Sequence, residues 1–195
     1  MAGQGLRERK QQRQRAAIVE VGMRLFTEKG FDATTVEEIA DTAEVSRRTL
    51  FRYFGTKGDI VMDWARGTTE TLCSALRARP LDESPMESLR AAFQALNRSF
   101  TGDVSAIHAQ ALMVERTTSL RPYSMLKHAQ WEEALAAALA ERDRRLDTAT
   151  SALLARIGVA AFRVALDEWL NGDGSDLPIE LTDRAFDLVR ETTRK

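Results

Sequence analysis

The feature that most constrains the fold is a pair of short, well-capped helical segments in the first third of the chain. Thr35 and Glu38 have the spacing of a capping box, in which each side chain bonds the other residue's backbone amide. Ser46 has the place of a second N-cap, with Val45 before it and Leu50 after it at the spacing of a hydrophobic staple. Two short helices joined by a three- or four-residue turn form a helix-turn-helix.

A longer helix is expected before this pair, over about residues 7–29, and Gly30 follows it as a glycine C-cap. Its packing face has helical spacing and consists of Ile18, Val21, Gly22 and Leu25. The second helix has a buried stripe of its own, made of Val36, Ile39, Ala40 and Ala43.

The rest of the chain also has helical periodicity. Thr56 and Asp59 have N-cap spacing for a fourth helix, expected to reach about Arg79. Further helices are expected over residues 86–100, 104–117, 119–143, 148–171 and 178–193. Proline and glycine are sparse, with four and eleven residues, and no alternating run of β-branched residues predicts a strand. We therefore predict an all-α fold, with an N-terminal domain over residues 1–56 and a larger helical domain over residues 57–195.

The third helix has an unusual outward face. At 100° per residue, Arg47, Arg48, Phe51 and Arg52 share one side, while Leu50 points the other way. The major groove of DNA admits a helix, and arginine pairs bidentately with guanine. The alternative is a solvated cationic face with one exposed aromatic ring, but the capped turn beside it favours contact with DNA bases.

The N-terminus adds a second positive region. The chain as a whole has a net charge of −1, yet its first 15 residues have a net charge of +4, from one acid and five basic residues: Arg7, Arg9, Lys10, Arg13 and Arg15. A basic arm on an acidic body predicts that a polyanion binds at one end. Charged N-termini are also often solvated tails.

The stretches Gly30–Ala40 and Val45–Lys57 are similar to the DNA-binding domain of TetR-family regulators. The resemblance implies that Thr35, Tyr53 and Lys57 contact phosphates and that the outward residues of the third helix face bases. It also places Leu50 and Phe54 in the core, and Phe51 stands where a tyrosine is commoner. The full predicted DNA-binding set is Arg13, Thr35, Ser46, Arg47, Arg48, Phe51, Arg52, Tyr53 and Lys57.

A homodimer is expected, because two recognition helices spaced to match successive major grooves, about 34–36 Å apart, bind a palindromic operator. Small and apolar residues of the last two helices are the candidate interface: Ile157, Gly158, Ala161, Ala165, Trp169, Leu181, Ala185 and Leu188. The alternative for the helix over residues 148–171, which is apolar almost all round, is a single buried core helix.

The resemblance further implies an apolar ligand cavity among the middle helices. Its candidate lining is Trp64, Phe93, Leu96, Phe100, Met113, Tyr123, Leu126 and Trp131, although such stripes are usually plain core. The stretches around residues 114–122 and 131–142 are similar to the C-terminal domain of mycofactocin-type regulators, which implies an acyl-CoA or another long apolar ligand. Arg116, Arg121 and Lys127 are candidates for its anionic end.

Catalytic and metal chemistry have little support. Cys73 is the single cysteine, so we expect no disulfide and interpret it as a packing residue rather than a redox sensor. The two histidines, His108 and His128, fall on separate helices without metal-ligand spacing, so no metal and no cofactor are expected. No phosphate-binding loop or nucleophile motif is present.

With no secretory signal and an unbroken apolar run no longer than residues 134–140, we expect a cytoplasmic protein without membrane contact. The prediction is a DNA-binding regulator, a repressor released by a small molecule. An alternative is a DNA-binding regulator controlled by a protein partner, and an enzyme is a rival without support.

Overall fold

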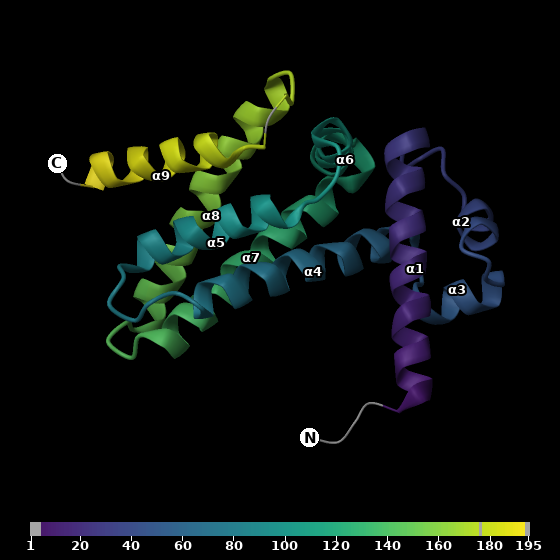
Figure 1. Cartoon of the computed structure of the whole chain (residues 1–195), viewed down its shortest axis with the longest axis horizontal. Helices are drawn as coiled ribbons and strands as arrows, with labels where there is room; N and C mark the ends of the chain where they lie inside the picture. The colour runs from purple at the N-terminus through teal and green to yellow at the C-terminus, as the bar shows by residue number, and fades with distance from the viewer. Residues whose placement is uncertain (1–4, 176, 194–195) are drawn as a thin grey trace. The chain divides into compact units, whose positions relative to one another are not determined.

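The computed structural model describes residues 5–175 and 177–193, and within them every regular element is helical. The predicted all-α class is therefore confirmed. The elements, labelled in Figure 1, are α1 (Leu6–Lys29), α2 (Val36–Thr42), α3 (Arg47–Tyr53), α4 (Lys57–Arg77), α5 (Pro85–Ser99), α6 (Val104–Arg116), the 3-10 helix η1 (Thr118–Leu120), α7 (Arg121–Arg142), α8 (Thr148–Asn171) and α9 (Ile179–Thr193).

The chain packs as two compact units. Among the described residues, the first unit consists of those up to Ala65 together with Leu112–Ser124, and the second of Arg66–Ala111 and those from Met125 onwards. The boundaries of these units fall inside α4, α6 and α7. The domain boundary at residues 56 and 57 stays a prediction.

The core of the first unit joins α1, α2, α3 and the start of α4. Ile18 and Phe26 of α1, Ile39 of α2 and Leu50 of α3 are almost wholly buried, as the helical periodicity predicts. Burying a side chain of this size stabilises the fold by roughly 1.5–3 kcal/mol. Leu120 of η1 is buried in the same cluster, so the later segment belongs to this core as well.

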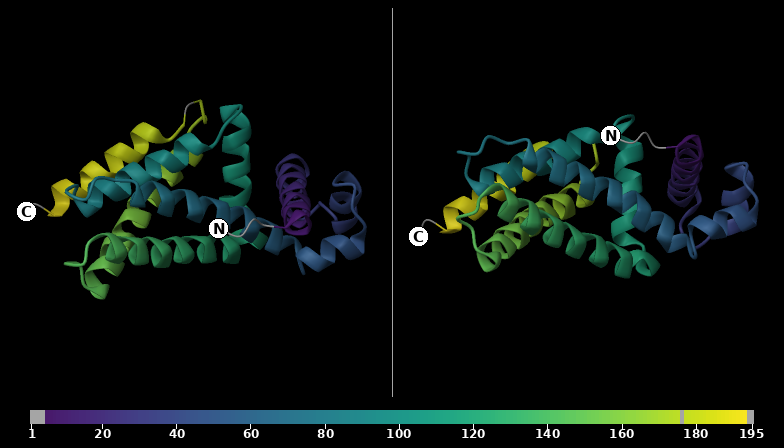
Figure 2. Two further views of the ribbon diagram at one scale, coloured as in Figure 1. Left: turned by 60° about the horizontal axis from the view of Figure 1, so that its bottom comes forward. Right: turned by 90° about the horizontal axis from the view of Figure 1, so that it is seen from below.

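In the second unit, α5, α8 and α9 pack on one another, and Figure 2 shows α9 lying along α5. Phe93 of α5 is fully buried among three aromatic rings. It stacks on Phe162 of α8 with the ring centroids 4.6 Å apart, and the rings of Trp131 and Phe186 lie 6.1 Å away. Aromatic pairs in these geometries contribute about 0.5–1.5 kcal/mol beyond their buried area.

Polar contacts attach α9 to α5 beside that aromatic cluster. The Arg90 guanidinium donates to Asp183 at 2.6 Å and to Asp187 at 3.2 Å. Asn97, which is buried, donates to the hydroxyl of Thr182 at 3.0 Å. One face of α9 is therefore packed against α5 of its own subunit.

Among the described residues, α8 is the one helix long and apolar enough to cross a membrane by length and composition. The length of unbroken apolar runs did not identify α8 in the sequence, because charged residues interrupt its apolar sequence at intervals. Core helices of globular domains pass the same test, and α8 is in contact with α5 and α9.

Candidate nucleic-acid interface

The two caps of the helix-turn-helix form as predicted. The Thr35 hydroxyl accepts the amide of Glu38 at 3.1 Å, and the Glu38 carboxylate accepts the amide of Thr35 at 2.9 Å. The Ser46 hydroxyl accepts the amide of Thr49 at 3.1 Å at the start of α3. Caps of this kind typically stabilise a helix by about 1 kcal/mol, so they fix where these short helices begin.

The turn between α2 and α3 contains one constrained residue. Glu44 has a φ of 53°, in the left-handed region that an L-residue enters at a cost of about 1–2 kcal/mol. The amide of Val45 reaches back to the carbonyl of Ala40 at 2.9 Å and closes the turn. This bend turns the chain so that α3 leaves α2 at an angle.

The side chains of α3 divide as the helical wheel predicts. Leu50 is buried, with 1% exposed, whereas Phe51 on the outward face is 47% exposed. Arg48 and Arg52 are exposed as well. An exposed phenyl ring among arginines does not stabilise the fold. This face is therefore suited to a partner that is anionic and partly apolar.

Arg47 and Arg48 occupy the first turn of α3, where the helix dipole disfavours a positive charge by about 0.3–1 kcal/mol for each residue. No acidic residue of α3 offsets them in this turn. Glu37 of the neighbouring helix α2 offsets the charge of Arg47 instead, because its carboxylate lies 2.6 Å from the Arg47 guanidinium. Sequence reasoning missed Glu37, since no local spacing rule joins side chains of two different helices.

Other predicted phosphate contacts already have partners in the first unit. The Tyr53 hydroxyl donates to Gln14 of α1 at 3.2 Å, and Arg52 lies over the Tyr53 ring at 5.0 Å. The Lys57 ammonium donates to backbone carbonyls of the loop between α1 and α2. The Thr35 hydroxyl donates to Glu38 at 3.1 Å. Their phosphate roles stay predictions, and each needs a local rearrangement.

The basic arm is not a separate arm over the described residues, because α1 begins at Leu6 and includes the basic positions up to residue 15. Arg9, Lys10 and Arg13 are exposed on this helix. Arg15 differs: it forms a bidentate pair with Asp63, at 3.0 and 2.7 Å, and lies over the Phe54 ring. The hydrogen bonds that Arg15 donates to the Asp63 carboxylate raise the pKa of Arg15. Its charge is neutralised locally, and residues 1–4 lie outside the described residues.

The predicted pocket residues are divided between the two units. Trp64, Met113 and Tyr123 belong to the first, and the ring of Tyr123 lies where a side chain on Gly58 would stand. The second holds Leu126, which is 48% exposed, and the buried core residues Phe93, Leu96 and Trp131, together with the half-buried Phe100. A shared cavity among them stays a prediction.

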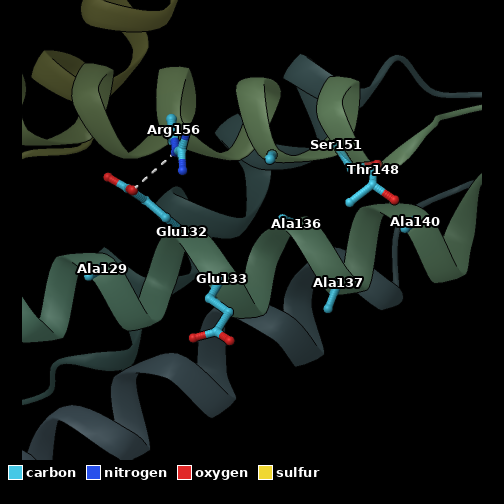
Figure 3. A pocket seen from close by; sticks show the side chains of 10 residues that line it. Ala129, Glu132, Glu133, Ala136, Ala137, Ala140, Thr148, Ser151 and Arg156 are labelled. Atoms are coloured by element: carbon cyan, nitrogen blue, oxygen red, sulfur yellow. Dashed lines mark ion pairs between the residues drawn. The ribbon is translucent and has the colours of Figure 1, made fainter.

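An open groove lies elsewhere in the second unit, along α7 and α8 (Figure 3), and has a volume of about 530 Å³. Its alanine-rich lining consists of Ala129, Glu132, Glu133, Ala136, Ala137, Ala140, Thr148, Ser151, Ala152 and Arg156. Glu132 and Arg156 form an ion pair of 3.6 Å in it, drawn as a dashed line. None of the eight predicted pocket residues lines this groove.

Most of the predicted dimer residues are covered by their own subunit. Gly158, Ala161, Ala165, Trp169 and Ala185 are buried. At Gly158 an added Cβ would lie 3.2 Å from Leu89, so the small residue serves packing against α5. Gly158, Ala161 and Ala165 are thus covered within their own subunit, and their place in a dimer interface stays a prediction. Of the predicted set, Ile157, Leu181 and Leu188 retain exposed surface.

The cysteine and histidine side chains, which could support redox or metal chemistry, are packed separately against other parts of the fold. The Cys73 thiol is buried in α4, and burial raises its pKa. His108 lies 3.2 Å from the Trp169 carbonyl, and the His128 ring packs against Trp131. Over residues 5–175 and 177–193, no group of three or more His, Cys, Asp or Glu side chains could hold a metal ion.

Two family models match the chain. Residues 18–62 match the model of bacterial regulatory proteins of the tetR family, and residues 83–194 match the MftR C-terminal domain. The regulator TcmR of Streptomyces glaucescens is 32% identical, over 98% of this chain and 88% of that protein. The Mycobacterium tuberculosis protein MftR, named for the regulation of mycofactocin biosynthesis, is 30% identical over 88% of this chain and 87% of its own length.

Solved structures share the fold. A TetR-family regulator from Syntrophomonas wolfei superposes with a TM-score of 0.69 at 15% identity, covering 94% of this chain and 96% of that one. FadR of Bacillus subtilis, solved with stearoyl-CoA, has a TM-score of 0.64 at 17% identity, over 89% and 96%. The site and fold define a helix-turn-helix transcriptional regulator. The chain belongs to the tetR family of bacterial regulatory proteins.

Proposed function

We propose that this regulator is a repressor that binds a palindromic operator as a homodimer and is released by a small apolar or amphipathic ligand. The observation that carries the DNA-binding part is the outward face of α3. Two arginines lie at its disfavoured positive end, and Phe51 is 47% exposed beside them. A duplex offers both phosphates and guanine edges to such a face.

Apolar side chains exposed on α8 and α9 support the homodimer. Leu153 and Val164 of α8 are 59% and 57% exposed, and Leu188 of α9 is 53% exposed. Exposed apolar surface of this kind is typical of protein interfaces. Leu188→Arg should give monomers in sedimentation velocity with unchanged helicity, and a dimer that survives this change and Val164→Arg would contradict the assignment.

The ligand-binding part is supported by the groove along α7 and α8. Its volume of about 530 Å³ lies within the range of small-molecule sites, roughly 300–1,000 Å³. The alanines suit an apolar chain, and the Glu132–Arg156 pair offers polar contacts, so an amphipathic molecule fits its chemistry. The FadR proteins of Bacillus subtilis and Thermus thermophilus were solved with stearoyl-CoA and lauroyl-CoA, which makes these compounds suitable probes.

Release requires the ligand to favour one conformation, since it shifts the equilibrium only by its differential affinity for the two states. We propose α4 as the moving element, because Lys57–Ala65 belong to the first unit and Arg66–Arg77 to the second. A ligand that tilts α4 would move both recognition helices of a dimer out of groove register.

The test is fluorescence anisotropy on a duplex selected from random-sequence DNA by the protein itself, with and without lauroyl-CoA and stearoyl-CoA. We expect tight binding that weakens steeply between about 50 and 200 mM salt, because phosphate contacts release counterions. Release by an acyl-CoA would support the ligand class, whereas binding unaffected by either compound would remove that class and keep the DNA-binding part. A flat salt response would contradict the DNA interface.

A further inference from the structure

Glu37 and Glu38 are adjacent acids in the first turn of α2, and their carboxylates have different partners. Glu38 turns back to the start of its own helix and accepts the Thr35 amide and the Lys29 ammonium, at 2.9 and 3.0 Å. The Glu37 carboxylate instead lies 2.6 Å from the guanidinium of Arg47, the first residue of α3. Glu37 therefore connects the two helices of the helix-turn-helix beside the face that is proposed to contact DNA.

The stability of the fold does not account for this ion pair. Both side chains are exposed, so water and salt screen their attraction. An exposed pair of this kind changes a folding equilibrium by no more than about fivefold, and often by nothing measurable. The pair also opposes the proposed function, because a carboxylate beside the recognition helix repels the phosphates of every duplex. The effect of Glu37 is therefore expected in DNA binding rather than in folding.

An arginine on a recognition helix can contact DNA in two ways. Its long side chain can reach a phosphate on any duplex, and such a contact carries no sequence information. It can also pair with the O6 and N7 atoms of a guanine, which only some sequences offer in the right place. A guanidinium has several N–H donors, so the Glu37 carboxylate leaves others of Arg47 available for a base. Because a base edge is neutral and a phosphate is an anion, the carboxylate opposes the phosphate contact more strongly than the base contact.

We propose that Glu37 is a specificity-determining residue, which keeps Arg47 from phosphates and leaves it available for a base edge. The proposal rests on the proposed DNA-binding function. Specificity is a difference between two affinities, and repulsion of the wrong partner increases it just as a new attraction to the right partner does. On a duplex without the matching base, Arg47 stays paired with Glu37 and makes no phosphate contact. On the operator, the base contact of Arg47 offsets the repulsion by Glu37.

The experiment compares Glu37→Gln, which removes the charge and keeps the shape of the side chain, with Asp41→Asn. Asp41 is an exposed acid one turn further along α2, so its substitution removes the same charge from the same helix. Affinity is measured by anisotropy over a range of salt concentrations, on the duplex that the wild-type protein selects and on an unrelated duplex. In the free protein, the mobility of the Arg47 guanidinium is measured by NMR relaxation of its Nε–H group.

For Glu37→Gln we expect discrimination between the two duplexes to fall by about fivefold, because the released Arg47 gains a phosphate on the unrelated duplex. The slope of log K against log salt concentration on that duplex should steepen by about 0.9 more than in Asp41→Asn, the value for one additional neutralised phosphate. Asp41→Asn should strengthen both complexes by the same factor and keep the discrimination. The Arg47 guanidinium should become more mobile in Glu37→Gln and stay unchanged in Asp41→Asn.

An equal change of affinity for the two duplexes in Glu37→Gln would overturn the proposal, because Glu37 would then act only as one more negative charge. An Arg47 guanidinium that is equally mobile in the wild type and in Glu37→Gln would also overturn it, and that measurement needs no DNA. Adding Glu37→Gln to Arg47→Ala should cause no further loss of discrimination, and a further loss would show that Glu37 does not act through Arg47. Failure of the wild-type protein to select a duplex would count against the proposed function instead.

Discussion

The helices α3 and α8 use apolar and charged side chains in opposite ways. α3 has seven residues and is anchored by the buried Leu50, while its arginines and Phe51 remain in solvent. α8 has 24 residues and buries ten of them against its own unit, including Ala165 and Phe162. The function of the short helix therefore depends on what it exposes, and that of the long helix on what it buries.

The largest effect on the free energy of unfolding is expected from a substitution in the core where α8 packs against α5. Phe93→Ala removes a ring that is fully buried and stacked on Phe162, so it should lower the free energy of unfolding by about 3–5 kcal/mol. Urea unfolding followed by circular dichroism measures this. Leu81→Ala is the control, because Leu81 is 74% exposed. Equal effects of the two changes would show that the aromatic cluster does not form the core.

The next test separates inward packing of α8 from a role in the dimer. Ala165 is fully buried, so Ala165→Leu should overpack the core and cost about 1–3 kcal/mol in unfolding free energy. Ala160→Leu, on the exposed side of the same helix, should cost little. If Ala165→Leu instead left unfolding unchanged and dissociated the dimer, then Ala165 would face the partner as the sequence suggested.

This contrast explains what could be predicted from the sequence. Thr35, Ser46 and Leu50 act through partners three or four residues away, so their spacing was sufficient to place the helix-turn-helix. Which faces of α8 are buried depends on α5 and α9, and α5 is distant in sequence. Because α8 is apolar almost all round, its sequence does not show which neighbour its small residues face. Glu37 and Asp63 were missed for the same reason, because their partners Arg47 and Arg15 lie on other helices.

A smaller effect is expected at the cap of α3. Ser46→Ala removes the hydroxyl that accepts the Thr49 amide, so it should cost about 1 kcal/mol of stability and weaken DNA binding. Thermal unfolding and anisotropy measure the two quantities. Ser74→Ala, at an exposed position inside α4, is the matched control. A loss no greater than that of the control would mean that the cap does not limit the formation of α3.

The smallest effect is a dependence on pH at the cap of α2. The hydrogen bond from the Thr35 amide, followed by that from the Lys29 ammonium, lowers the pKa of Glu38 from 4.5 to about 2. The folded pKa lies below the unfolded one, so this contribution to stability is present above pH 4.5 and is lost as the pH falls towards 2. Unfolding of Glu38→Gln should be less sensitive to pH in that window. An unchanged pH profile would contradict the capping role of the carboxylate.

The central claim is that the outward face of α3 contacts DNA bases. The most direct test is anisotropy of Arg48→Ala and Arg52→Ala on the duplex that the wild-type protein selects and on an unrelated duplex. Arg184→Ala is the control, because Arg184 is exposed, is paired with Glu168 and belongs, like Glu168, to the second unit. We predict that each α3 variant loses about 1–3 kcal/mol of discrimination between the duplexes while the control keeps it. Unchanged discrimination in both α3 variants would contradict the account.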